Sequence, residues 1–180
     1  MKKILFIISS LDNSGPCKVL ENQILAINKS EYEVYVMSFF SGNSNLEKKI
    51  ENNVKKIICL NTNRLSCLFN PYKIIAVIKK IKPDVVHSHG LLPDYINSKL
   101  KNIKKINTLH CNIYSDYCYE YGKLKGKIYV LLHLFVLKKL DKIVCCSRSV
   151  LVDMKKSKLK NLQYVRNGIE LNYKLNNVNV

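Results

Sequence analysis

The stretch Ile4–Ile27 constrains the fold more than any other part of the chain, because it reads as a buried strand, a turn and a helix. Ile4–Ile8 is a short, continuous apolar run rich in β-branched side chains, which is typical of a strand covered on both faces. Turn-forming residues follow it up to Pro16, and proline suits the first turn of a helix. A buried strand that passes directly into a helix is the unit from which parallel sheets with helical crossovers are built.

Strand-like and helix-like segments alternate along the rest of the chain. Further strands are expected at 32–40, 54–60, 85–89, 106–111, 142–147 and 163–166, and further helices at 46–51, 71–81, 92–100, 129–140 and 150–156. The tyrosine-rich segment 114–122 has no clean period and is expected to be a loop. The alternation predicts an α/β fold with a doubly wound, mostly parallel, Rossmann-like sheet. We expect a single domain over residues 1–169 and a polar tail over residues 170–180.

The net charge of +17 is large for a chain of 180 residues, and nearly all of it comes from lysine. Such a charge favours acidic lipid, nucleic acid or phosphorylated substrates as partners. The only arginines are Arg64, Arg148 and Arg166, and no aromatic stacking motif is present. We therefore expect no nucleic-acid binding, since that function usually relies on guanidinium groups and stacked rings. A composition bias of the coding genome is an alternative explanation of the lysine excess.

The seven cysteines contain no Cys-x-x-Cys pair, so a zinc ribbon is unsupported and a reducing compartment is expected. The amino-terminal apolar run resembles a secretory signal only superficially, because no small-x-small cleavage site follows it. The longest apolar run elsewhere, 128–137, is too short to span a bilayer. These features predict a cytoplasmic protein, either soluble or peripheral on the inner face of the plasma membrane.

Residues suited to ligand binding or catalysis follow the predicted strands at their carboxyl ends. These ends meet at one edge of a parallel sheet. The residues at these positions are Gly15, Ser41, His89, His110, Ser147 and Asn167. Gly15 stands at a helix start, where unpaired N–H groups and the helix dipole favour a phosphate. His110 ends a strand, where an imidazole can donate to a hydroxyl or a phosphate. The simpler alternatives are a plain helix cap at Gly15 and a hydrogen bond from His110 to a loop carbonyl.

The remaining histidines have more than one interpretation. His87 and His89 stand two apart on one strand and should share a face. No spacing supplies the further ligands that a zinc site would need, so no metal is expected, and His87 should be buried against a backbone carbonyl. His133 lies in the apolar run between lysines, which could press on an anionic membrane. Apolar residues occupy almost every face of the helix that carries His133. This pattern favours burial of the helix against the sheet instead.

Several motifs of well-known enzyme classes are absent. The carboxylates Asp12, Asp94 and Asp116 do not form the pair that glycoside hydrolysis uses. No P-loop, nucleophile elbow or EF-hand loop is present, and the absence of Gly-x-Gly-x-x-Gly disfavours hydride transfer.

Five motifs, in this order, resemble the amino-terminal half of family 4 glycosyltransferases, which are retaining enzymes of the two-Rossmann-domain GT-B class. The motifs are Ile4–Ile8 with the Ser14–Gly15 loop, Lys82–Gly90, Thr108–His110, Val144–Ser147 and Asn167–Glu170. The resemblance covers nearly the whole chain. It implies the acceptor-side domain of an enzyme that transfers a hexose from a nucleoside diphosphate sugar. The acceptor would be a glycan or a lipid-linked hydroxyl in the synthesis of capsule, lipopolysaccharide or another surface polysaccharide.

The resemblance also implies roles for individual residues. His110 matches the catalytic histidine near the transferred sugar, and Gly15 matches the glycine loop that faces the donor diphosphate. Together with the edge argument, this makes Ser14, Gly15, His89 and Ser147 the candidates for binding the substrate or its phosphates. The stretch with Asn167, Gly168 and Glu170 matches the junction with a second domain. Pro16 departs from the family pattern, which more often has a second small residue there.

Neither a metal nor another cofactor is expected, because the nucleoside diphosphate sugar is itself a substrate. The chain ends about where the family's nucleotide-sugar-binding domain should begin. We therefore expect this half to be inactive until that C-terminal domain is supplied, for example by a separate chain. The alternative function is a non-enzymatic, cationic α/β module that binds acidic membranes or polyanions.

Overall fold

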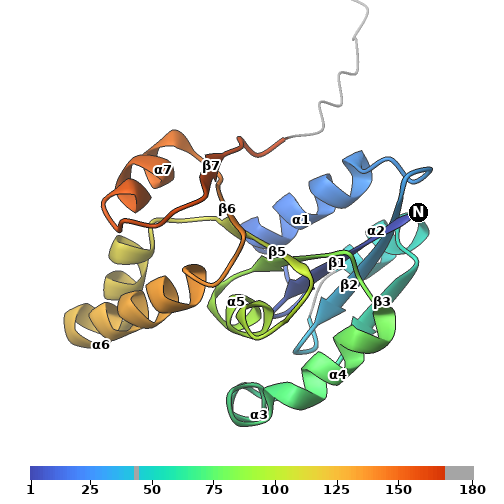
Figure 1. Ribbon diagram of the computed structural model, residues 1–180, viewed down its shortest axis with the longest axis horizontal. Coiled ribbons are helices and arrows are strands. Elements are labelled where there is room, and N and C mark those ends of the chain that lie inside the picture. Colours follow the sequence, from blue (N-terminus) through green and yellow to red (C-terminus); the bar gives the residue numbers. More distant parts are fainter. Residues whose placement is uncertain (43–44, 169–180) are drawn as a thin grey trace, which may run out of the picture.

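The computed structural model describes residues 1–42 and 45–168, which form a central sheet with helices on both faces (Figure 1). The strands are β1 (Lys2–Ile8), β2 (Tyr32–Ser38), β3 (Lys56–Cys59), β4 (Val85–His89), β5 (Lys104–Leu109), β6 (Lys142–Cys145) and β7 (Leu162–Tyr164). The helices are α1 (Gly15–Ala26), α2 (Leu46–Ile50), α3 (Arg64–Phe69), α4 (Pro71–Ile81), α5 (Leu91–Ser98), α6 (Ile113–Leu137) and α7 (Arg148–Lys155), with a 3-10 turn at Glu51–Asn53. All neighbouring strands are parallel, which confirms the predicted doubly wound α/β fold.

The strand order is β3-β2-β1-β4-β5-β6-β7, so the chain leaves β1 first toward one side and later toward the other. The order reverses between β1 and β4, and ligands of open α/β sheets bind beyond the carboxyl ends of the strands at this kind of switch point. The register aligns Ile8 of β1 with His89 of β4, and His89 with Thr108 of β5. The carboxyl ends of these three strands therefore lie level at one edge.

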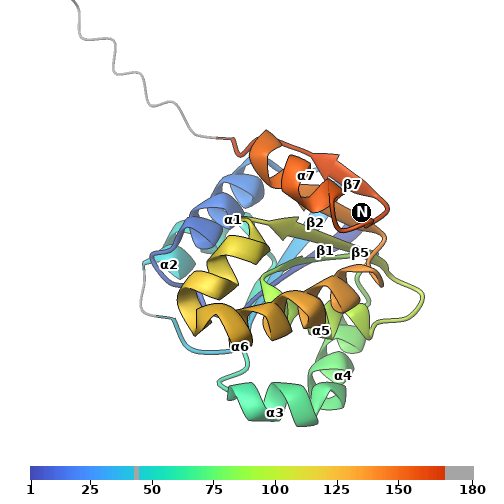
Figure 2. The same ribbon diagram turned by 90° about the vertical axis from the view of Figure 1, so that its left-hand side faces the viewer.

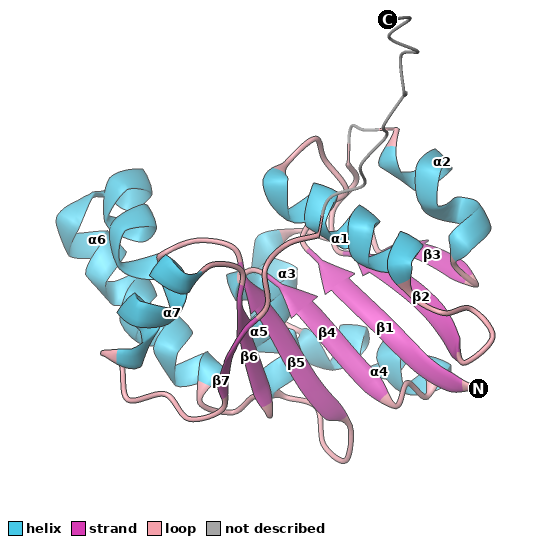
Figure 3. Ribbon diagram, turned by 90° about the horizontal axis from the view of Figure 1, so that it is seen from above, coloured by secondary structure: helices cyan, strands magenta, loops and turns pink. Residues whose placement is uncertain are grey.

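Successive side chains of β1 enter two different cores, as expected for a strand that is covered on both faces. Leu5 and Ile7 pack with apolar side chains of α4 and α5, including Ile78 and Ile96. Phe6 and Ile8 pack on the other face with residues of α1 and α2, which include Cys17, Leu20, Ile24, Leu46 and Ile50. Figure 3 shows α1 and α2 on one side of the strands and α4 on the other.

A third core lies at the β6 and β7 end of the sheet, where Figures 1 and 3 place α6 and α7. Its members come from β5, β6, α6 and α7 and include Leu109, Val130, Leu137, Ile143, Cys145 and Met154. Cys145 is buried at the end of β6, and Cys146, directly after the strand, is half-buried and packs against the same core. All seven cysteines are free.

The tyrosine-rich segment 114–122 is helical, so the prediction of a loop is wrong. Asn112 caps the helix, because its side chain accepts a hydrogen bond from the N–H of Tyr114 at 2.9 Å. Gly122, with φ +79°, bends α6 into two arms, which Figure 2 shows in yellow and orange. The first arm packs Tyr117 and Tyr121 on Tyr129 of the second arm. This contact between the two arms, in addition to the contact with the core, accounts for the lack of a clear apolar period in the first arm.

Other differences from the predicted elements are smaller. The helix α3 was not expected, and it begins where the side chain of Asn63 accepts a hydrogen bond from the N–H of Ser66 at 2.8 Å. The strands β1 and β4 end where predicted, whereas β2, β3, β5, β6 and β7 end one or two residues before the predicted limits. The predicted burial of the helix 129–140 holds for only one of its faces, since Leu131 and Phe135 are exposed. The tail 170–180 lies outside the described residues.

Candidate functional site

A row of histidines crosses the carboxyl edge of the sheet from β4 to the residue after β5. The rings of His87 and His89 stack with centroids 4.8 Å apart, which confirms that both point to one face. The ring of Phe6 lies 5.2 Å from that of His87 and belongs to the core under α1. The histidines therefore face the side of the sheet that α1 covers.

His110 and His89 form the centre of this site. Nδ1 of His89 and Nε2 of His110 are 2.9 Å apart, and their rings stack with centroids 5.1 Å apart. His89 is buried, with 2% of its surface exposed, whereas His110 is half-buried. Of the two imidazoles, His110 is therefore the one that a ligand at the edge can reach. A further hydrogen bond runs from the Cys146 thiol to the His110 carbonyl at 3.2 Å and ties the residue to the end of β6.

All three imidazoles of the row are held in their neutral form. Burial lowers the pKa of His87 to about 3, and a charge on His110 would lower it further. Burial and the two neighbouring imidazoles keep the pKa of His89 well below its usual value. Burial also lowers the pKa of His110 to about 4, although the Asp94 carboxylate acts in the opposite direction. At neutral pH, His110 can thus donate or accept a hydrogen bond, but it cannot act as a cation.

The partner of His87 differs from the one predicted. Its Nε2 lies 2.8 Å from the hydroxyl oxygen of Thr108 on β5, so a side chain and not a backbone carbonyl satisfies the ring. Nε2 of His89 is buried without a hydrogen-bond partner among the described residues.

Gly15 is the first residue of α1, and the helix start is open. Ser14 occupies the N-cap position but its side chain makes no capping hydrogen bond, and no acidic residue lies in the first turn. A Cβ placed on Gly15 would meet no atom within 4 Å. Pro16 removes one N–H from the first turn, so the donors there come from Gly15 and Cys17. The start of α1 lies beyond the carboxyl end of β1, at the same edge as His89.

The segment after β7 returns to α1. The side-chain amide of Asn22 donates to the carbonyl of Gly168 at 2.8 Å, which places Gly168 beside this helix. Asn167 precedes it and is exposed, and Glu170 lies outside the described residues. Ser147 is the N-cap of α7, where its hydroxyl oxygen accepts a hydrogen bond from the N–H of Val150 at 3.2 Å. Its geometry shows a capping role, and phosphate binding by Ser147 stays a prediction.

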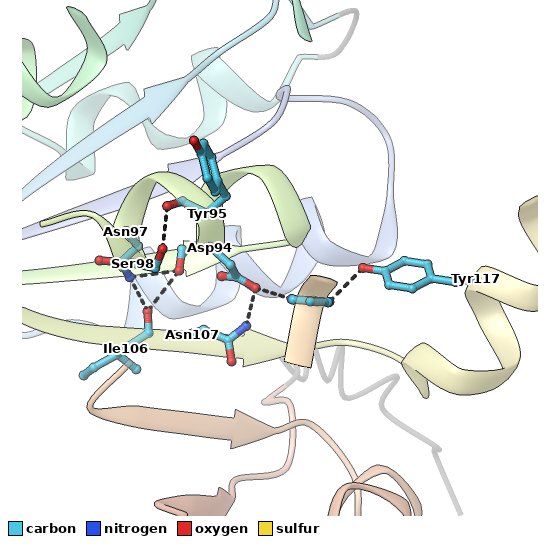
Figure 4. A network of polar contacts seen from close by, with 9 residues as sticks. Asp94, Tyr95, Asn97, Ser98, Ile106, Asn107 and Tyr117 are labelled. Atoms are coloured by element: carbon cyan, nitrogen blue, oxygen red, sulfur yellow. Dashed lines mark hydrogen bonds and ion pairs between the residues drawn. The ribbon is translucent and has the colours of Figure 1, made fainter. Parts of the chain in front are cut away.

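A second polar network lies on the opposite face of the sheet, under α5 and α6 (Figure 4). The Asp94 carboxylate, 0% exposed, accepts a hydrogen bond from the side-chain amide of Asn107 at 2.9 Å. The same carboxylate oxygen lies 2.8 Å from Nε2 of His133, and Nδ1 of His133 lies 2.8 Å from the hydroxyl of Tyr117. Burial raises the pKa of Tyr117, and the Asp94 charge adds to this effect, so the phenol keeps its proton. The Tyr117 hydroxyl can therefore donate to Nδ1 of His133, while Nε2–H of His133 donates to Asp94.

Sequence reasoning did not find this Asp94, His133 and Tyr117 network. The sequence favoured burial of the helix that carries His133, and this residue is buried with 2% of its surface exposed. A histidine and an aspartate on buried helix faces both require hydrogen-bond partners. This requirement is the sequence signal that could have suggested a contact between them. The two residues are 39 positions apart, and no local spacing shows that they meet.

Possible metal ligands, surface hollows and membrane-spanning helices add little to the site. Among residues 1–42 and 45–168, no group of three or more His, Cys, Asp or Glu side chains is arranged to hold a metal ion. A hollow lined by Met1, Lys2, Ser30, Glu31, Tyr32 and Asp84 lies at the amino-terminal ends of the strands, away from the histidines. In the described part of the chain, no helix combines the length and the apolarity required to cross a bilayer.

The strand order, the switch point and the histidine edge define a Rossmann-like domain of the kind found in GT-B glycosyltransferases. The solved structures with this fold include Anabaena Alr3699/HepE in complex with UDP, with a TM-score of 0.70 and 11% identity. It aligns over 94% of this chain and 45% of its own. Sucrose-phosphate synthase from Thermosynechococcus elongatus has a TM-score of 0.68 and 12% identity, over 94% of this chain and 49% of its own.

The family model Glycosyltransferase Family 4 matches residues 15–173, and the chain belongs to this family. The O-antigen biosynthesis glycosyltransferase WclY of Escherichia coli is 27% identical over 153 residues. That match covers 82% of this chain and 39% of the relative, so the chain spans well under half of the length of that protein. The membership confirms the resemblance that the five sequence motifs indicated.

Proposed function

We propose that this chain is the acceptor-side domain of a retaining hexosyltransferase that builds a cell-surface polysaccharide. The observation that carries the proposal is the His89 and His110 pair at the carboxyl edge of the switch point, in a chain that belongs to Glycosyltransferase Family 4. In the reaction, the bond from the anomeric carbon of the donor to the diphosphate oxygen breaks. A bond from that carbon to the acceptor oxygen forms with the same anomeric configuration, and the hydroxyl proton passes to the departing diphosphate.

His110 would bind the transferred sugar as a neutral hydrogen-bonding group. Its pKa of about 4 keeps it uncharged, which suits a contact with a sugar hydroxyl better than neutralisation of a diphosphate. The hydrogen bond to buried His89 fixes the plane of the His110 ring before the substrate arrives. Such preorganisation reduces the reorganisation that the reaction requires.

The leaving diphosphate would be stabilised in part by the open start of α1. The N–H groups of Gly15 and Cys17 have no side-chain cap, and a helix start carries partial positive charge. The relative HepE was solved with UDP, which supports a nucleoside diphosphate as the leaving group here. The remaining contacts to the nucleotide sugar would come from a second domain, on the same or another polypeptide.

The acceptor and the location of the reaction are also part of the proposal. WclY acts in O-antigen biosynthesis and WaaB is a lipopolysaccharide outer core galactosyltransferase, which supports a glycan or lipid-linked acceptor. WaaB shares the fold with a TM-score of 0.64 and 15% identity over 93% of this chain and 46% of its own. Seven free cysteines are consistent with a reducing cytoplasm, and we place the reaction at the inner face of the membrane.

A transfer assay tests the proposal. The 180-residue chain is incubated with radiolabelled nucleoside diphosphate hexoses and a lipid-linked saccharide extract, alone and fused to the part of WclY that follows the matched residues. We expect label to enter the lipid fraction only with the fused protein, and the product to keep the anomeric configuration of the donor. Turnover by the chain alone would show that no second domain is needed. A folded fusion that transfers none of the hexoses would contradict the enzymatic role and favour the cationic binding module.

A further inference from the structure

The second arm of α6, residues 123–137, exposes a row of large apolar side chains. Leu124, Ile128, Leu131 and Phe135 recur every three or four residues, which places them on one face of the helix. Leu124 is 78% exposed, Leu131 67% and Phe135 60%. Leu132 adjoins them and is also exposed. We call these five side chains the α6 apolar row, and contiguous exposed groups of this kind usually mark an interaction surface.

The opposite face of the same arm is fixed to the body of the protein. Val130, His133 and Leu137 are buried, and His133 lies in the network with Asp94 and Tyr117. At Gly126 the two arms are in backbone contact, because a Cβ there would lie 2.5 Å from Cα of Cys118. The arm therefore cannot roll to bury its row without breaking these contacts.

Lysines border the α6 apolar row on both sides. They are Lys123, Lys125, Lys127, Lys138 and Lys139, and all are exposed. Helical geometry puts Lys125 and Lys139 on one side of the row and the other three on its other side. The stretch 122–140 contains no Asp or Glu. Nζ of Lys139 lies 4.1 Å from the centre of the Phe135 ring, so this ammonium group adjoins the row.

We propose that this arm docks on the surface of an acidic lipid bilayer. The apolar row would enter the boundary between headgroups and acyl chains, and the lysines would bind the lipid phosphates. A helix with one apolar face, flanking lysines and no acidic residues has the composition that binds in the plane of an anionic interface. Each lysine near such a surface adds attraction that depends on salt.

The lysines also decide between a bilayer and a second copy of the chain. Two copies that paired their apolar rows would bring five lysines of each copy together, and the stretch 122–140 supplies no carboxylate to neutralise them. Acidic lipid supplies the missing negative charge. The proposal does not depend on the transfer reaction, because vesicle binding needs no nucleotide sugar, and the two proposals can therefore fail separately.

Vesicle flotation with a matched pair of variants tests the apolar part of the surface. The chain is floated with vesicles of equimolar phosphatidylglycerol and phosphatidylcholine. We expect the double variant Leu131→Asn and Phe135→Asn to bind at least about tenfold more weakly than the wild type, since binding scales with buried apolar area. The control is Leu65→Asn with Phe69→Asn on α3, also a leucine and a phenylalanine four residues apart, 66% and 81% exposed. It should bind within about twofold of the wild type.

Charge variants test the electrostatic part. Replacing Lys123, Lys125 and Lys127 by Gln should weaken binding by about fivefold for each lysine. The same replacement of Lys48, Lys49 and Lys56, which are exposed on α2 and β3, should have a much smaller effect. Binding should fall steeply in about 1 M salt, where the Debye length is about 3 Å. Equal losses in the two lysine sets would mean that overall charge, not this helix, drives binding.

Fluorescence locates the contact, because the chain contains no tryptophan. We expect the emission of Leu131→Trp to shift to the blue with these vesicles and to be quenched by brominated lipid, and that of Leu65→Trp to stay unchanged. Absence of a shift at position 131, or the same shift at both positions, would overturn the proposal. Sedimentation that showed a dimer lost in the Leu131→Asn and Phe135→Asn variant, without vesicle binding by the wild type, would assign the row to a second copy instead.

Discussion

Nε2 of His133 on α6 lies 2.8 Å from a carboxylate oxygen of Asp94 on α5, and both side chains are buried. The contact joins the bent helix α6 to the face of the sheet opposite the histidine row. Asp94 also accepts a hydrogen bond from the side-chain amide of Asn107, so the network ties α6 to β5, the strand that ends beside His110. The candidate site and the exposed arm of α6 thus share one buried support.

Asp94→Asn should destabilise the fold by about 2–3 kcal/mol. The Asp94 carboxylate accepts hydrogen bonds from both Asn107 and His133. The amide of Asn is a weaker, uncharged acceptor, and its N–H group would face one of these two donors. Denaturant unfolding measures the loss. A double-mutant cycle with His133→Gln should show coupling of at least about 1 kcal/mol. Additive effects would mean that the two side chains do not depend on each other.

Tyr117→Phe should cost about 1 kcal/mol of unfolding free energy, because it removes the hydroxyl that bonds Nδ1 of His133. Tyr119 is the matched control, since it lies on the same arm and is 94% exposed. Thermal unfolding should show a lower midpoint for Tyr117→Phe and an unchanged one for Tyr119→Phe. Equal midpoints for the two variants would contradict the proposed network.

The substitution Gly126→Ala should destabilise the chain by about 1–3 kcal/mol, since its Cβ would overlap the backbone of Cys118 in the facing arm.

Gly15→Ala offers the opposite case, because open space surrounds that position. Its unfolding free energy should change by less than about 1 kcal/mol. A large loss of transfer by the fused enzyme carrying Gly15→Ala, with stability kept, would support close approach of a phosphate there. Wild-type activity in that variant would remove Gly15 from the site.

Stability should fall as the pH decreases from 7 to 5. Burial lowers the pKa of His87 to about 3 and of His110 to about 4, so both stay neutral in the fold but take up protons when unfolded near their usual pKa of 6.5. Their contribution is complete above that pH and is lost as the pH falls toward the folded values. Each contributes a slope of up to about 1.4 kcal/mol per pH unit within this window. Urea unfolding at both pH values should show a smaller pH dependence in His87→Gln than in the wild type, and an unchanged dependence would be inconsistent with a neutral His87 ring in the fold.

The sheet could be predicted from the sequence because its strands are buried on both faces. Runs such as Ile4–Ile8 stay apolar without interruption, and turn formers mark their ends. The gathering of His89 and His110 also followed, since the carboxyl ends of parallel strands share an edge. The direct hydrogen bond between His89 and His110 could not be predicted from the sequence, because it depends on the rotamers of two side chains 21 positions apart.

The helix α6 was the hardest element to predict. Its first arm packs on its own second arm, so the apolar period that marks contact with a sheet is missing around Tyr117. The second arm is apolar on both faces, and composition alone cannot show which face the sheet covers. The contact of His133 with Asp94 fixes which face of the arm is buried. Leu131 and Phe135 therefore point outward.

The transfer rate of the fused enzyme with His110→Gln tests the central claim most directly. The claim is that the half-buried imidazole at the end of β5, held by His89, touches the transferred sugar. The account predicts a kcat at least about 100-fold below the wild type, for a variant whose circular dichroism and vesicle binding are unchanged. A folded His110→Gln enzyme with a kcat within a few-fold of the wild type would contradict it.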